Sequence, residues 1–90
     1  MRPNGYNLFM ALKRLSLLNT PLNWHNFWLM FGWFWDDLEP ITREWFKMAA
    51  LTIRQAGHTN VHGWFNIVLV AQHALDVDTY YTLLLIAEYV

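Results

Sequence analysis

Histidines are the residues of this chain whose type and spacing come closest to a metal site. His58 and His62 are four residues apart, a spacing at which two imidazoles on one helix face can bind the same transition metal. The residues around His58 are typical of a turn, however, and no carboxylate lies between the two histidines. A third ligand would have to come from His73, His25 or a distant carboxylate. We therefore predict no metal site, with His58, His62 and His73 as weak candidates.

His25 and His73 could also act as the two axial ligands of a haem held in an aromatic bundle. His73 lies among apolar residues in AQHALDVD, where a single histidine is usually a hydrogen-bonded core or interface residue. Nothing in the spacing requires haem, so no cofactor is expected.

Two acidic clusters contain oxygen ligands of the kind that divalent cations prefer. They are Asp36, Asp37 and Glu39, followed by Asp76 and Asp78. Both clusters lie where one helix is expected to end and the next to begin, and carboxylates are favoured there as helix caps alone. We prefer the capping interpretation.

The chain offers little for nucleophilic catalysis. It has no cysteine, and its one serine, Ser16, lies among leucines with no histidine or acid nearby. A serine nucleophile needs a base within hydrogen-bond reach. Acid–base chemistry would require folding to bring together residues such as His25, Asp36, Asp37 and His62. We predict a protein that is not an enzyme.

Turn and cap residues divide the chain into short helical segments. The expected helices are 6–18, a second from Pro21 to about 38 with Thr20 as its cap, 40–56 ending at Gly57, 61–75 capped by Thr59 or Asn60, and 79–89 capped by Asp76 or Asp78. The IVLV segment between 65 and 71 could instead be a buried strand, but no second strand is present to pair with it. The prediction is one all-α domain, residues 1–90, built as a bundle of four or five short helices.

The composition is unusually apolar for so short a chain. Hydrophobic residues make up 56% and charged residues 14%, against roughly 45–50% and 25% in ordinary soluble domains. A domain of this size buries only about 60–65% of the surface that its unfolded chain exposes. Part of the apolar surface must therefore stay exposed, and large exposed patches mark interfaces.

The second expected helix, from Pro21 to about 38, is predicted to be apolar on nearly all sides. One stripe is predicted to fill the core, together with two later tryptophans: Trp24, Trp28, Phe31, Trp35, Trp45 and Trp64. The remaining faces of this helix carry residues that we predict to form an interface: Phe27, Met30, Trp33 and Phe34.

Charge and hydropathy limit the partners. The formal net charge is −1 and the basic residues are not clustered, which argues against nucleic acid and against an anionic membrane surface. The uncharged run 21–35 is shorter than the roughly 20 residues of a membrane span, and the run 55–75 contains histidines and amides that are costly in hydrocarbon. With no cysteine and no secretory signal at residues 1–18, the predicted location is cytoplasmic.

These observations favour a small, non-catalytic helical interaction protein. It is expected to bury an aromatic surface by homodimerisation or by docking onto another protein. One alternative is a bundle that binds an apolar or haem-like ligand. The other is a membrane-associated small subunit, which the abundance of tryptophan and tyrosine would suit.

Overall fold

The computed structural model describes residues 1–18 and 24–90, and the side chains in these ranges except those of residues 24–28 and 31. The described chain forms five α-helices and no strand: α1 (Gly5–Ser16), α2 (Trp24–Asp37), α3 (Pro40–Gln55), α4 (Trp64–Ala74) and α5 (Val77–Tyr89). The predicted all-α class is confirmed. The IVLV segment is helical, as expected, because it lies within α4.

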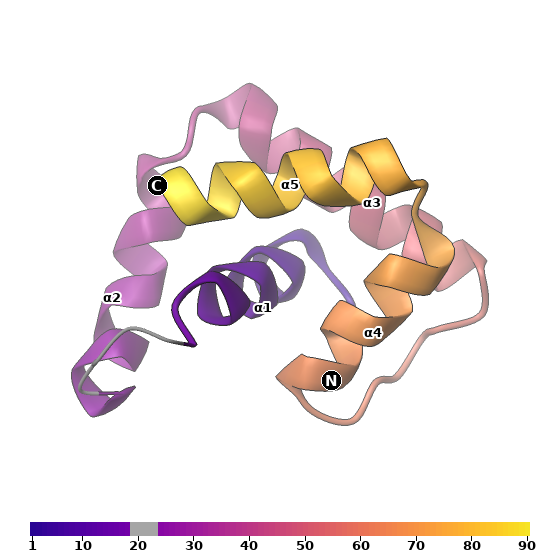
Figure 1. The fold of residues 1–90 in the computed structure, drawn as a ribbon, viewed down its shortest axis with the longest axis horizontal. Coiled ribbons are helices and arrows are strands. Elements are labelled where there is room, and N and C mark those ends of the chain that lie inside the picture. The colour runs from indigo at the N-terminus through magenta and orange to yellow at the C-terminus, as the bar shows by residue number, and fades with distance from the viewer. Residues whose placement is uncertain (19–23) are drawn as a thin grey trace.

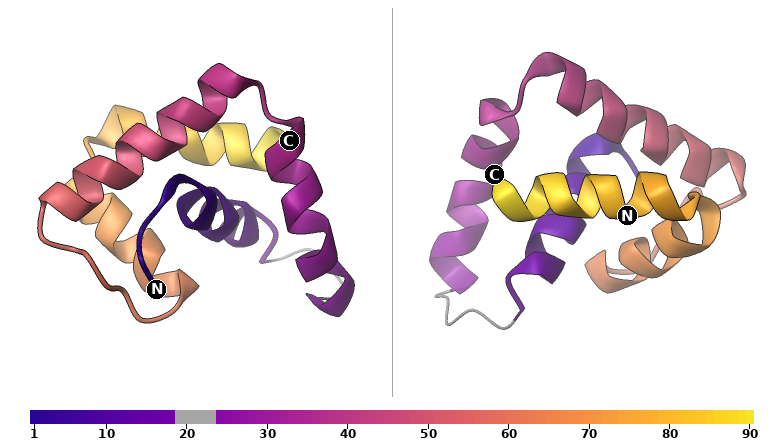
Figure 2. Two further views of the ribbon diagram at one scale, coloured as in Figure 1. Left: turned by 180° about the vertical axis from the view of Figure 1, so that it is seen from behind. Right: turned by 45° about the horizontal axis from the view of Figure 1, so that its top comes forward.

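α1 is the central helix of the bundle, with α2 at one side and α4 at the other (Figure 1). The same order is seen from behind and from above in Figure 2. α1 packs mainly against α3, α4 and α5. It is apolar on several faces, as suits a central helix, and its fully buried side chains are Leu8, Phe9, Ala11 and Leu12.

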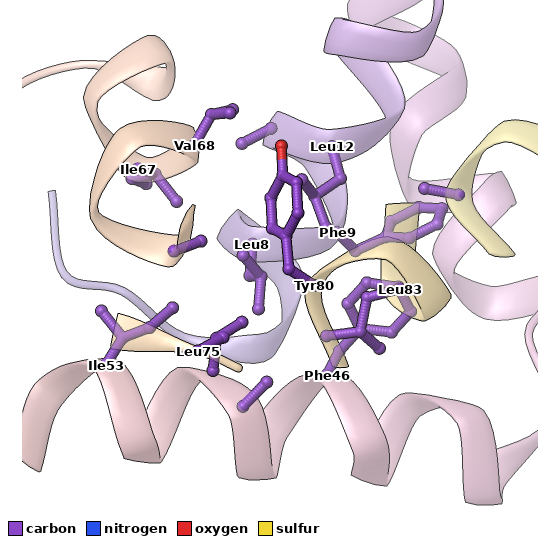
Figure 3. Close-up of a cluster of buried hydrophobic side chains, with 14 of the residues drawn as sticks. Leu8, Phe9, Leu12, Phe46, Ile53, Ile67, Val68, Leu75, Tyr80 and Leu83 are labelled. Atoms are coloured by element: carbon purple, nitrogen blue, oxygen red, sulfur yellow. The ribbon is translucent and has the colours of Figure 1, made fainter. Parts of the chain in front are cut away.

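Aromatic side chains join three helices in the core. Phe9 of α1 meets Phe46 of α3 edge to face with 5.4 Å between ring centroids, and Trp35 of α2 lies 5.7 Å from Phe9. Tyr80 extends from α5 between α1 and α4 (Figure 3). Its hydroxyl accepts a hydrogen bond from the Gln72 amide at 3.0 Å, so the one polar atom of this side chain is satisfied.

A close contact fixes α1 against α3. A Cβ atom on Gly5 would lie only 2.7 Å from the Cγ atom and 3.0 Å from the backbone nitrogen of Lys47. Glycine therefore lets the start of α1 approach the backbone of α3 directly. Ala49 and Ala50 of α3 are also small and buried, so the same side of α3 that holds Phe46 and Ile53 can lie close to α1.

The ends of α3 follow the expected turn chemistry. Pro40 occupies the first turn, where its missing N–H is harmless. At the other end, the N–H of His58 donates to the carbonyl of Ile53, and the N–H of Gly57 donates to that of Arg54. Gly57 has a φ of 102°. These two bonds and the left-handed glycine form a Schellman motif, which confirms Gly57 as the helix stop.

The predicted start of α4 is wrong. Neither Thr59 nor Asn60 caps the helix, which begins three residues after Val61 with Gly63 in the cap position. Instead, the Asn60 Oδ1 atom accepts from the Met1 nitrogen at 2.8 Å, and the Val61 N–H donates to the Met1 carbonyl at 2.7 Å. These long-range bonds hold residues 58–63 in an irregular connection.

The bundle is closed in spite of its apolar composition. Its accessible surface is 5602 Å², close to the value of about 5,500 Å² that the mass of 10.8 kDa predicts for a folded monomer. The apolar side chains that remain outside are therefore an excess over a complete core.

Candidate protein-interaction surface

The outer face of α3 is an apolar stripe that no other part of the described structure covers. Ile41, Trp45 and Met48 repeat at intervals of four and three residues and are 55%, 47% and 65% exposed. The inner face of the same helix buries Phe46, Ala49, Ala50 and Ile53. The spacing makes α3 apolar on two sides, and only one of them faces α1.

The expectation that Trp45 belongs to the core is wrong. Its neighbour Phe46 takes the core position and is fully buried. Phe46 packs edge to face on Phe9 of α1 and lies 6.3 Å from the ring of Trp35, and the residue directly before it points to a different side of the helix. Trp45 is left on the outer face.

This face of α3 continues into a groove of about 900 Å³ that reaches α5. Trp45, Met48, Thr52 and Gln55 form one side at the periodicity of a helix face, and the turn between α4 and α5 with the start of α5 forms the other. Buried Ala49, Leu75 and Leu83 contribute its apolar base. A groove with an apolar floor and exposed large side chains on one wall is suited to an amphipathic segment.

Acidic residues mark one end of the groove. Asp76 and Asp78 both line it, and no lysine or arginine does. Asp76 is also the N-cap of α5, which confirms one of the two predicted caps. It accepts hydrogen bonds from the N–H of Thr79 at 2.9 Å and from the Thr79 hydroxyl at 2.7 Å. These bonds hold the pKa of the Asp76 carboxyl below its usual value, so its negative charge is secured near neutral pH.

The interface that the sequence predicts on α2 is only partly on the surface. Met30 and Trp33 are 40% and 68% exposed, and Leu29 beside them is also exposed. Phe34 is half-buried instead, because it packs against the core and its ring lies 5.0 Å from the Lys13 ammonium. The side chain of Phe27 lies outside the described residues.

Two further tryptophans from the predicted core set do pack inward. Trp35 and Trp64 are half-buried against the main core cluster. The Arg14 guanidinium lies 4.5 Å from the Trp64 ring in a cation–π contact. The side chains of Trp24, Trp28 and Phe31 lie outside the part that the structure describes, so their predicted core role is untested.

The histidines do not assemble in the described structure. His58 and His62 both lie in the connection before α4, so they do not share a helix face, and His73 is exposed on α4. Among the described side chains, no three of His, Cys, Asp or Glu come close enough to hold a metal ion. The side chain of His25 lies outside the described residues.

The remaining chemical candidates have structural contacts. The Ser16 hydroxyl donates to the carbonyl of Lys13 at 2.6 Å. Glu39 occupies the N-cap position of α3 without a side-chain capping bond.

Within the described residues, no helix combines the length and the apolar character that a membrane span requires.

Sequence reasoning missed the groove. The signal was present, since Ile41, Trp45, Met48 and Thr52 follow one face of a helix. It could not be used, because Phe46, Ala50 and Ile53 form a second apolar face and the sequence alone does not say which face turns inward.

No family model, no curated protein and no solved structure matches this chain.

Proposed function

We propose that the protein is a non-catalytic interaction module that uses the outer face of α3 and the adjoining groove to bind another polypeptide. The observation that carries this proposal is the exposure of Trp45 and Met48, at 47% and 65%, on a wall of the groove. Tryptophan and methionine are enriched at protein interfaces. A tryptophan that stands beside a groove has the form of a binding anchor.

The rigid support of this surface favours a binding role. The opposite face of α3 is held by Phe46 and Ile53, both fully buried, and its end is fixed by the Schellman motif at Gly57. A surface that is already ordered loses little conformational entropy when a partner binds. The α3 wall of the groove is thus already ordered before a partner binds.

A small apolar ligand is the second candidate, because a volume of about 900 Å³ lies within the range of ligand pockets. Such pockets enclose most of their ligand, however. Here the wall residues Trp45 and Met48 are themselves largely in solvent, so a small molecule would stay exposed on one side. A polypeptide helix would cover the whole stripe from Ile41 to Gln55, which rises about 21 Å along the axis.

The proposal is tested by replacing Met48 with the photo-crosslinking residue benzoyl-phenylalanine in cells that make the protein. Thr59, an exposed residue in the connection before α4, is the matched control position. Covalent adducts with a polypeptide are expected at position 48 and not at 59. The adduct mass separates a second copy of the chain from a different protein. Irradiation that gives no adduct at 48 beyond the level at 59 would overturn the proposal.

A further inference from the structure

The charged side chains are distributed unevenly between the interior and the surface. All seven aspartates and glutamates are exposed, whereas only Arg2 and Lys47 are exposed among the six lysines and arginines. Every charged side chain lies in the described part of the structure. The most exposed charged side chains are therefore mainly acidic, although the formal net charge is only −1.

Three of the four less exposed cations donate to backbone carbonyls. Lys13 is 4% exposed and its ammonium donates to the Val90 carbonyl at 2.6 Å. Burial lowers the pKa of Lys13, and the Glu88 carboxylate opposes that shift. Arg54 donates to the carbonyl of Pro3 at 2.6 Å. Both cations therefore hold segments that are far apart in the sequence together.

A third cation is used in the same way at the end of α2. Arg43 donates to the carbonyls of Asp36 at 3.1 Å and of Leu38 at 2.8 Å. Arginine there satisfies carbonyls that the helix end leaves without partners. Of the two exposed cations, Lys47 is already paired with Glu44 at 3.1 Å.

From this distribution we infer that the occupant of the groove is a cationic amphipathic helix from another protein. Its apolar residues would cover Trp45 and Met48, and its lysines or arginines would lie against Asp76 and Asp78 at the groove's end. This inference rests on the proposed function and adds the chemistry of the partner. Charge complementarity of this kind sets orientation and speeds association.

A second copy of this chain fits the groove less well. Its whole surface carries seven exposed carboxylates and only two exposed cations. A symmetric dimer that joins two copies of the groove would bring Asp76 and Asp78 of both copies to one interface. Like charges placed opposite each other disfavour that arrangement.

The inference is tested with two labelled peptides of about 16 residues that share the same leucine positions on one helix face. One carries lysines on its polar face and the other carries glutamates. Fluorescence anisotropy gives the affinity of each for the full chain, with Met48→Glu as the variant that blocks the groove. Binding of the lysine peptide, its loss in Met48→Glu and no binding of the glutamate peptide are expected.

The matched charge variants are Asp76→Asn with Asp78→Asn, and Asp36→Asn with Asp37→Asn at the other end of the molecule (Figure 1). Asparagine at position 76 can still cap α5. The first pair is expected to weaken the lysine peptide by about three- to tenfold, because each exposed ion pair contributes modestly. The second pair changes the net charge equally and is expected to leave the affinity almost unchanged, since salt screens distant charges.

Each other outcome has a distinct meaning. Equal binding of both peptides with loss in Met48→Glu would overturn the cationic partner and keep the groove as the site. No peptide binding, together with a dimer that Met48→Glu dissociates in sedimentation, would assign the groove to a second copy and also overturn the inference. No binding by either peptide and a monomer at all concentrations would overturn the inference and count against the proposed function as well.

Discussion

The outer faces of α2 and α3 both present a tryptophan and a methionine to solvent, but the two helices are held in different ways. Trp33 and Met30 of α2 are 68% and 40% exposed, and Trp45 and Met48 of α3 are 47% and 65% exposed. α3 packs extensively on α1, whereas among the described side chains of α2 it is Trp35 that makes ring contacts with α1, 5.7 Å from Phe9 and 5.8 Å from Tyr6. The described end of α2 is attached chiefly through Trp35, Leu38 and the bonds from Arg43.

This difference shows that exposed aromatic area alone does not define a binding site. The α3 face adjoins a groove with an apolar base and an acidic end, so it offers a shape and a charge to recognise. A firmly packed helix also keeps its anchors in place before binding. On these grounds the α3 face, and not the α2 face that the sequence favoured, is the better candidate.

The largest expected difference in stability is between substitutions of the two adjacent aromatic residues of α3. Phe46→Ala is expected to reduce the free energy of unfolding by about 3–5 kcal/mol, because it opens a cavity in the core. Trp45→Ala should cost less than about 1 kcal/mol while removing partner binding. Urea denaturation measures the free energy of unfolding of each variant. Similar losses for the two variants would contradict the assignment of an inner and an outer face to α3.

The attachment of α2 is tested by Arg43→Met, which keeps the aliphatic stem and removes the donors to the Asp36 and Leu38 carbonyls. The expected loss is about 1–2 kcal/mol, since these bonds involve a charged donor and are partly exposed. Hydrogen exchange should speed up in α2 amides and stay unchanged in α5. Uniform acceleration across all helices would show that α2 is not a separately held element.

The smallest expected effect concerns the acidic end of the groove. Because the native pKa of Asp76 lies below its usual value, its contribution to stability is complete above about pH 3.8 and is lost as the pH falls through the lower native value. Asp76→Asn retains the cap and cannot titrate there. Thermal unfolding from pH 5 to pH 2 should show a weaker acid dependence in this variant than in the wild type. Identical pH profiles would contradict the role of the Thr79 bonds.

The sequence predicted the helices well where a local residue decides the boundary. Pro40, Gly57 and Asp76 act through their own backbone or through bonds a few residues away. The start of α4 was missed because Asn60 bonds to the distant Met1 nitrogen. A contact between residues so far apart in the chain leaves no local pattern to read.

The sequence predicted that an apolar surface would be exposed, but it did not identify the outer face of α3 as part of it. Composition showed that some apolar surface must remain exposed, and the structure places Trp33 and Met30 on the surface as expected. The choice between the two faces of α3 depends on which of them packs on α1, where Phe46 meets Phe9. The excess of exposed acidic over exposed basic side chains depends on the contacts of Lys13, Arg43 and Arg54 with backbone carbonyls. Both are properties of tertiary packing, and neither can be obtained from residue counts.

Methionine oxidation compares the two faces directly, because Met48 reports on α3, Met30 reports on α2 and Met10, at 8% exposure, is a buried reference. Mass spectrometry after brief peroxide treatment gives the oxidation of each residue in dilute purified protein and in extract of cells that produce it. The groove account predicts that the extract protects Met48 while Met30 oxidises as before. Protection of Met30 with Met48 unchanged would contradict it.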